Sequence, residues 1–149
     1  MKVLAIDPGT TQSAYVLWND RSIHLLGIRE NDEVRLMLRD WVIDSCTLVI
    51  EQIRCYGMPI GQTTLDTVFW SGRFWEAWTG DKHLMPRLEV KKHICHNGVA
   101  KDSNIRQALI DRFGPPGVKK DPGLLYGVKK DIWAAMAIAV TWMDQAKSK

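Results

Sequence analysis

The chain has few cysteines and no long apolar run. Its three cysteines among 149 residues, Cys46, Cys55 and Cys95, do not indicate a disulfide framework. No apolar run approaches the roughly 20 residues of a membrane-spanning helix, so we expect no membrane partner. The first residues lack the pattern of a signal peptide, from which we expect a cytoplasmic protein. Repeats and low-complexity tracts are also absent, which predicts one domain over residues 1–149.

Charge is unevenly distributed along the chain. The net charge is +3, but residues 1–86 hold 8 Lys and Arg against 11 Asp and Glu, whereas residues 87–149 hold 12 against 6. A basic C-terminal third suits a polyanionic partner such as nucleic acid. A solvated basic surface without a partner explains the same numbers, so charge alone leaves both interpretations open.

Short apolar runs separated by turn residues predict the strands. Residues 2–6, 13–18 and 22–28 read as a three-stranded meander. The run 46–53 is continuously apolar like 2–6, which is typical of central parallel strands covered on both faces. A helix capped by Asn31 or Asp32 separates these two runs.

The second half predicts one further strand and three helices. Residues 62–79 form a helix, 87–94 a fifth strand, and a helix capped by Asp102 or Ser103 runs to about Phe113. A mobile basic loop occupies 114–128, and the last helix starts near Asp131. The pattern therefore predicts an α/β fold with a five-stranded mixed sheet and helices on both faces.

The helix expected over residues 62–79 carries two apolar stripes. One consists of Leu65, Val68, Phe69, Gly72 and Trp75, and the other of Trp70, Phe74 and Trp78. Two stripes indicate burial on two sides, of which one packs on the sheet. The other side meets either a second subunit or the neighbouring helix, and the pattern leaves both open.

Two of the apolar strands contain an acid. If the first and fourth strands are parallel neighbours, Asp7 and Glu51 lie side by side near one edge of the sheet. Close carboxylates repel, and a shared proton or a bound cation resolves the repulsion. Asp131, in the first turn of the last helix, is a third candidate. An all-oxygen set favours Mg²⁺ or Mn²⁺ over zinc, and "HICH" at 93–96 lacks a second ligand pair for zinc.

Four segments in order resemble one known family. "AIDPGTTQSAYVLW", "LVIEQ", "GVAKDSNIRQAL" and "AAMAIAVTW" are similar to the RuvC Holliday-junction resolvases of the ribonuclease H-like superfamily, with the short phage-type members most alike. The resemblance implies a ribonuclease H-like fold and metal-dependent cleavage of four-way DNA junctions by two subunits making paired nicks. It implies the cytoplasm of a bacterium or of a phage-infected host. Two divalent ions held by carboxylates suit such phosphodiester hydrolysis.

The resemblance also implies roles for individual residues. Asp7 and Glu51 correspond to metal ligands, and Asp131 to the first of two acids, three residues apart, on the family's last helix. The second of these positions holds Ala134, so either three acids suffice or another group such as Asp102 joins them. Lys101 lies where the family commonly has a basic residue near the scissile phosphate, although the family's lysine alternatively aligns with Asp102.

Basic residues and one aromatic residue are candidates for DNA contacts. Arg54 and Arg73 are expected nearer the acids, and Tyr56 either stacks on a base or is an ordinary loop residue. Contacts of basic residues to phosphate fix position without reading sequence. The lysine candidates are Lys91, Lys92, Lys119, Lys120, Lys129 and Lys130.

Each acid also has an ordinary interpretation. Asp7 before Pro-Gly suits a turn, Glu51 suits a pair with an arginine such as Arg54, and Asp131 suits a helix N-terminus.

A YqgF-type nuclease acting on structured RNA also begins with a "D-x-G-T" strand, and a junction-binding protein without cutting activity fits the alanine at 134. Actin-like ATPases share that strand as well, but they need two such lobes.

Overall fold

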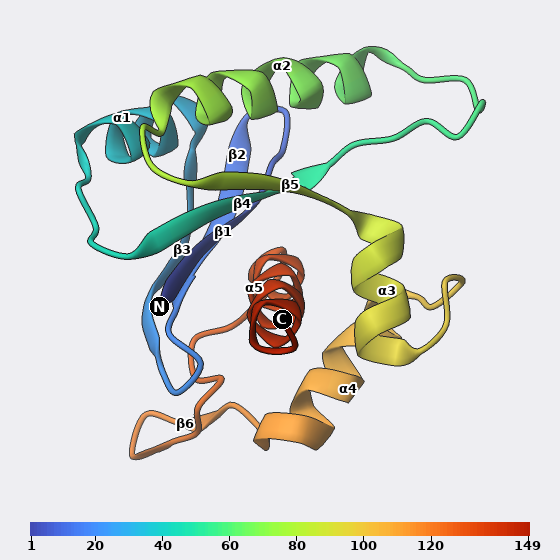
Figure 1. The fold of residues 1–149 in the computed structure, drawn as a ribbon. Coiled ribbons are helices and arrows are strands. Elements are labelled where there is room, and N and C mark those ends of the chain that lie inside the picture. Colours follow the sequence, from blue (N-terminus) through green and yellow to red (C-terminus); the bar gives the residue numbers. More distant parts are fainter.

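The computed structural model describes residues 1–149 and confirms the expected class, a mixed five-stranded sheet with helices on both faces (Figure 1). In chain order the elements are β1 (Lys2–Asp7), β2 (Gln12–Trp18), β3 (Ile23–Glu30), α1 (Asn31–Asp40), β4 (Cys46–Gln52), α2 (Gln62–Ala77), β5 (Lys82–Pro86), α3 (Arg87–Cys95), α4 (Asp102–Phe113), β6 (Gly117–Val118), β7 (Asp121–Pro122) and α5 (Ile132–Lys147). None of these helices combines the length and the apolar character required to cross a membrane.

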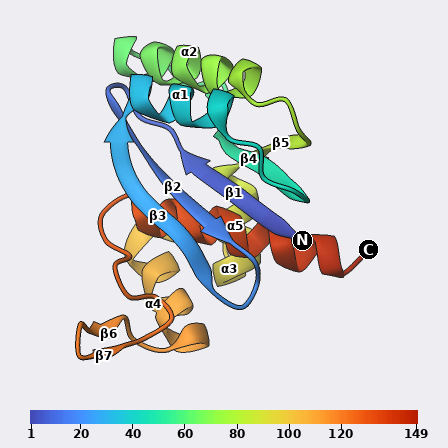
Figure 2. The same ribbon diagram turned by 90° about the vertical axis from the view of Figure 1, so that its left-hand side faces the viewer.

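The sheet has the order β3-β2-β1-β4-β5. β1, β2 and β3 form the expected antiparallel meander, and β4 runs parallel to both β1 and β5. α1 and α2 cover one face, whereas α5 lies against the other face with α3 and α4 beside it (Figure 1). Figure 2 shows α5 lengthwise beneath the strands.

Alternation of side chains along β1 divides the core into two parts. Val3 and Ala5 belong to the apolar cluster around α5, and Leu4 and Ile6 belong to the cluster beneath α1 and α2. Both faces of β1 are therefore buried, as its uninterrupted apolar run predicts.

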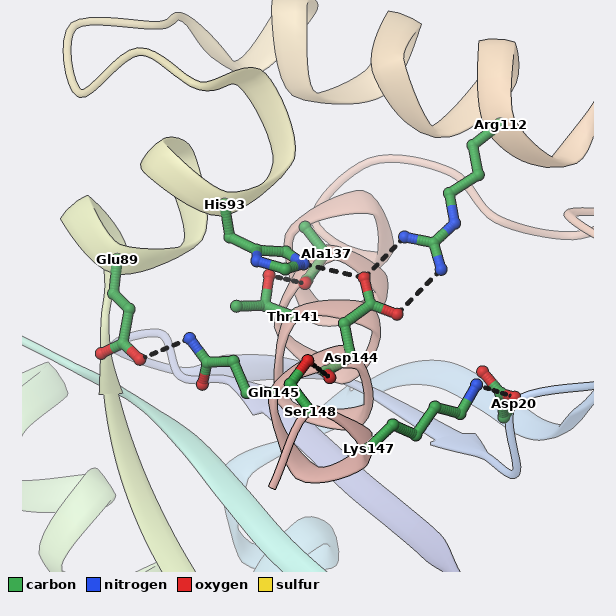
Figure 3. Close-up of polar contacts among 10 residues, drawn as sticks. All are labelled: Asp20, Glu89, His93, Arg112, Ala137, Thr141, Asp144, Gln145, Lys147 and Ser148. Atoms are coloured by element: carbon green, nitrogen blue, oxygen red, sulfur yellow. Dashed lines mark hydrogen bonds and ion pairs between the residues drawn. The ribbon is translucent and has the colours of Figure 1, made fainter.

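The C-terminal end of α5 is tied to α3 and α4 by one carboxylate. His93 Nε2 lies 2.8 Å from Asp144 Oδ2, and Arg112 Nη1 and Nη2 donate to the two oxygens of Asp144 at 2.6 and 2.8 Å (Figure 3). The hydrogen bond from Arg112, assisted by His93, holds the pKa of Asp144 below its ordinary value. His93 thus has a structural partner in the folded chain.

Residues 87–94, expected as the fifth strand, form helix α3, so that prediction was wrong. The fifth strand is the preceding segment, β5, and Pro86 directly precedes the helix with φ −65° and ψ 142°. A proline is tolerated at a helix start because the first helical amides have no partner inside the helix. Leu88 and Val90 alternate as in a strand, but Val90 and Ile94 share one helical face and pack in the α5 cluster.

Residues 114–128, expected as a mobile basic loop, contain a short hairpin of β6 and β7. Gly117 adopts a φ of +74° at its start, a conformation that favours glycine. The expected cap of α1 was also wrong, because Glu30 occupies the N-cap position and no side chain caps the helix.

Candidate active site

Asp7 and Glu51 reach the same face of the sheet through strand alternation. Ile6 pairs with Ile50 in the parallel β1–β4 ladder, so the next residues, Asp7 and Glu51, are neighbours at the carboxyl ends of the two strands. Asp7 lies two residues after Ala5, and Glu51 lies two residues after Val49. Each acid therefore points to the same face of the sheet as Ala5 and Val49, which is the face covered by α5. The sheet and α5 thus enclose two acids between them.

The chain leaves β1 through a turn that side chains hold in place. Asn31 Nδ2 donates to Gly9 O at 2.9 Å, Ser13 Oγ donates to Asn31 Oδ1 at 2.6 Å, and Gly9 N donates to Ser13 Oγ at 3.1 Å. A Cβ on Gly9 would meet Gln12 O at 2.2 Å, so this backbone approach requires glycine. Asn31 therefore fixes the segment after Asp7 instead of capping α1.

A cavity of about 90 Å³ opens at this end of the sheet. Its polar lining is Asp7, Glu51, Arg87, Asp102, Lys130 and Asp131, and its apolar lining is Val90, Ile105, Trp133, Ala134, Ala137 and Ile138. Typical small-molecule sites enclose roughly 300–1,000 Å³. The space therefore suits ions, water and a single phosphate group, and it does not suit a whole nucleotide.

The carboxyl of Asp7 has a strongly perturbed environment. Burial, followed by the hydrogen bond and charge of Glu51 and the charge of Asp131, raises the pKa of Asp7 to about 9, and Arg87 opposes this rise. The ordinary interpretation of Asp7 as a solvated turn residue does not account for such a shift. Perturbed acids in a cleft mark candidate functional sites.

Arg87 is the residue of this cavity that sequence reasoning missed. Its Nη1 donates to Glu51 Oε1 at 3.3 Å, and its Nη2 pairs with Asp102 Oδ1. Arg54, suggested as the partner of Glu51, instead donates Nε to Gln52 Oε1 at 2.9 Å. The signal available was the position of Arg87 directly after Pro86, which becomes informative only when β5 is recognised as ending there.

The carboxylate oxygens that line the cavity are suitable ligands for a hard cation. Asp7, Glu51 and Asp131 supply only oxygen atoms to one cavity, as Mg²⁺ and Mn²⁺ prefer. No three His, Cys, Asp or Glu side chains are grouped so that they hold one ion as they stand. Asp7 and Glu51 are in contact, whereas Asp131 acts on Asp7 only through its charge, and Glu51 is engaged by Arg87. Loading of a cation therefore requires side chains to move.

The other predicted catalytic positions divide between the cavity and its surroundings. Asp102 and Ala134 line the cavity, but Lys101 does not. Lys101 is the N-cap residue of α4, and its backbone amide donates to Asn104 Oδ1 at 2.9 Å. Asp102 is the next residue, so Lys101 lies just outside the lining.

The predicted DNA contacts fall in four places. Lys130 lines the cavity next to Asp131, while Lys119, Lys120 and Lys129 are exposed on the chain leading to it. Arg54 and Tyr56 line an open groove with Lys92 and His93.

Arg73 lies apart from these residues, on α2. Its guanidinium lies over the Trp70 ring, 4.3 Å from the centroid, in a groove shared with Arg35 and Arg39. The structure therefore does not bring Arg73 to the acids.

Two solved structures resemble the chain over nearly its whole length. One is Thermus thermophilus RuvC, with a TM-score of 0.65 and 16% identity, covering 99% of this chain and 96% of that chain. The other is T. thermophilus RuvC in complex with a Holliday junction substrate, with the same TM-score and coverage and 13% identity. No family model and no curated protein sequence matches the chain.

These likenesses define the class of fold. The chain has a ribonuclease H-like fold of the RuvC type, which confirms the resemblance noted in the sequence at the level of fold. Because identities this low identify architecture alone, function has to be argued from the site.

Proposed function

We propose that the chain is a structure-selective, metal-dependent endonuclease that resolves four-way or branched DNA junctions, with residues 1–149 acting as one nuclease domain. The observation that carries the proposal is the cavity at the carboxyl ends of β1 and β4, where Asp7, Glu51 and Asp131 converge within a RuvC-type fold. The similar RuvC structure that holds a Holliday junction supports a junction as the substrate.

Asp7, Glu51 and Asp131 would hold two divalent ions in each site. These ions would be Mg²⁺, for which Mn²⁺ would substitute. Ions bound by such carboxylates make water a better nucleophile and neutralise the charge on the leaving oxygen. Val90, Ile105 and Ile138 form an apolar wall beside the acids. Lys130 places positive charge beside them, where a DNA backbone would approach.

Paired nicks require two copies of the site, and α2 offers a surface for a homodimer. Leu65, Val68 and Phe69 of the first apolar stripe are 49%, 46% and 64% exposed, although Phe74 of the second stripe is fully buried. Exposed apolar patches of this kind are common at subunit interfaces. The stripe therefore favours a second subunit over complete cover by the neighbouring helix α1.

The test is cleavage of a labelled four-way junction in Mg²⁺, read on both pairs of opposing strands. We expect symmetric nicks from the native chain and a loss of at least about 10³-fold in rate for Asp7→Asn, with junction binding retained. Asp44→Asn changes an exposed acid in the loop before β4 and is expected to cut at the native rate.

Linear duplex and structured RNA serve as competing substrates. Preferential cutting of RNA would replace the proposal with the YqgF-type activity. Junction binding by both the native chain and Asp7→Asn, with cutting by neither, would instead identify a junction-binding protein.

A further inference from the structure

Arg87 joins a buried acid and an exposed acid at the mouth of the cavity. The side chain of Glu51 is 7% exposed and that of Asp102 is 77% exposed, with the guanidinium of Arg87 between them at 39%. Nη1 of Arg87 donates to Glu51 Oε1 at 3.3 Å, near the upper limit of a hydrogen bond, and Nη2 pairs with Asp102 Oδ1. The guanidinium therefore bridges the buried acid and the exposed acid.

The backbone fixes both ends of the Arg87–Asp102 pair. Arg87 is the first residue of α3, directly after β5, and Asp102 is the first residue of α4. Both helices are anchored within one or two turns by the buried residues Val90 and Ile105, which line the same cavity. The pair thus has a defined place at the rim of the cavity.

Glu51 cannot serve Arg87 and a divalent cation equally. The carboxylate is buried and already in contact with Asp7, so a cation bound there competes with the guanidinium for its oxygens. Two positive charges on one carboxylate repel each other. Cation binding therefore favours release of the Nη1 contact, while Asp102 continues to hold Nη2.

A released guanidinium edge is suited to phosphate. Arginine presents several N–H donors in a fixed planar fork, and one part of the fork can stay on a carboxylate while another contacts a phosphate oxygen. Lys130 also lines the cavity but has no carboxylate partner that positions it, and Lys101 lies outside the lining. Arg87 is the cation in this cavity that other side chains orient.

We propose that Arg87 exchanges partners, contacting Glu51 in the free protein and the reacting phosphate once a cation occupies Glu51, with Asp102 as its positioning residue. The proposal rests on the proposed function, since it assigns a residue to the phosphate of that same site. The proposal also gives a role to Asp102. From the resemblance alone, Asp102 was either an additional metal ligand or the residue that aligns with the family's lysine.

The first test measures Mn²⁺ binding without DNA, by the loss of the free-ion signal in electron paramagnetic resonance. Removal of a competing cation in Arg87→Gln is expected to tighten Mn²⁺ binding by about 10-fold. Arg21→Gln, an exposed arginine in the β2–β3 turn at the opposite end of the sheet, serves as the matched control and leaves binding unchanged. Weaker or unchanged Mn²⁺ binding by Arg87→Gln overturns the exchange, because Arg87 would then support Glu51 or be irrelevant to it.

The second test separates chemistry from binding. Arg87→Gln is expected to lower the single-turnover rate of junction cutting at saturating Mg²⁺ by about 10²-fold, the scale for loss of one charge-stabilising donor, while the junction Kd in Ca²⁺ stays within about 3-fold. Arg87→Lys keeps the charge and is expected to recover part of the rate. Added guanidinium ion is expected to restore part of the rate of Arg87→Ala.

Asp102→Asn tests the positioning role. It is expected to lower the rate by about 10-fold, and the double variant with Arg87→Gln is expected to be no slower than Arg87→Gln alone, because Asp102 acts through Arg87. Additive losses in the double variant would overturn that role.

Failure of this inference and failure of the proposed function have different signatures. If the native chain cuts junctions and Arg87→Gln cuts them at the same rate, the inference is wrong and the proposed function stands. If the native chain cuts no nucleic acid, the proposed function and the phosphate contact both fail.

Discussion

Helices α5 and α2 have the same length, 16 residues, and cover opposite faces of one sheet, yet they are buried very differently. Nine residues of α5 are buried, whereas only Phe74 is buried in α2. Small residues such as Ala135, Ala137 and Ala139 let α5 lie closely against the strands. Alanine is also the best helix former, so the same residues favour the helix and its close packing.

The difference indicates how each helix serves the protein. The apolar surface of α5 is buried within the chain, and a polar residue lies at each end of the helix. Asp131 precedes the first turn and lines the cavity. Asp144, near the C-terminal end, contacts His93 of α3 and Arg112 of α4. α2 retains three exposed apolar side chains in its first stripe, Leu65, Val68 and Phe69. A helix with unsatisfied apolar surface is suited to association.

The largest expected effect lies in the middle of α5. Met136 is fully buried there, and Met136→Ala should lower the free energy of unfolding by about 3 kcal/mol through lost contacts and a cavity. Denaturation in urea measures the change. Leu65→Ala, on the exposed stripe of α2, should change the stability of the monomer by no more than about 0.5 kcal/mol. Equal losses in the two variants would remove the contrast between the helices.

The next effect concerns Asp7, which faces the beginning of α5. Its pKa rises from 3.8 to about 9 on folding, so the acid binds a proton more tightly in the folded state. The resulting stabilisation is complete below about pH 4 and is lost progressively as the pH rises toward 9. Asp7→Asn removes the burial cost of the charge, and the variant should exceed the native chain by about 2 kcal/mol at pH 8 in the absence of metal.

Unfolding measured from pH 4 to pH 9 tests this dependence on pH. The advantage of Asp7→Asn should grow steadily with pH, whereas Asp44→Asn should show no such trend. A constant difference across the range would mean that the Asp7 charge is not destabilising in the fold.

A smaller effect is expected at the other end of α5. The pKa of Asp144 is lowered by Arg112 and His93, so its contribution to stability is present above about pH 4 and is lost as the pH falls through the lowered pKa. Because Arg112 is 44% exposed, Asp144→Asn should cost only about 1 kcal/mol at pH 7. The cost should shrink on acidification, and a cost that persists at pH 2 would assign Asp144 a packing role instead.

The smallest effect on stability, and the most informative about α2, is that of Phe69→Asp. The side chain is 64% exposed, so the monomer should unfold as the native chain does, but association should be weakened at least about 10-fold by a charge in the stripe. Light scattering over a range of protein concentrations measures the change. Val42→Asp, at a side chain that is 92% exposed in the loop before β4 and outside the stripe, is the control. A native chain that stays monomeric at all concentrations would leave α2 without the proposed partner.

Much of the fold and the placement of three acids were predictable from the sequence. The continuous apolar runs ending near Asp7 and Glu51 indicate neighbouring buried strands, and parallel pairing then brings their ends together. Asp131 was predictable from its place at the start of the last helix. These features depend on local periodicity, which a single sequence displays.

The features that were not predictable depend on contacts between residues that are far apart in the sequence. Arg87 was missed because "LEVK" alternates like a strand, and only the pairing of β5 with β4 shows that the strand ends at Pro86. Asn31 looked like a helix cap, yet its side chain turns toward Gly9, 22 positions earlier in the chain. Tertiary contacts decide such choices, and local sequence does not encode them.

The dispersal of the acids along the chain has a consequence during synthesis. Asp7 and Glu51 emerge from the ribosome long before Asp131, and α5 inserts between the sheet and α3 and α4 only after those elements exist. An incomplete polypeptide therefore lacks both the third carboxylate and the helix that walls the cavity. Under the proposed function, a copy that ends before α5 would therefore be unable to cut DNA.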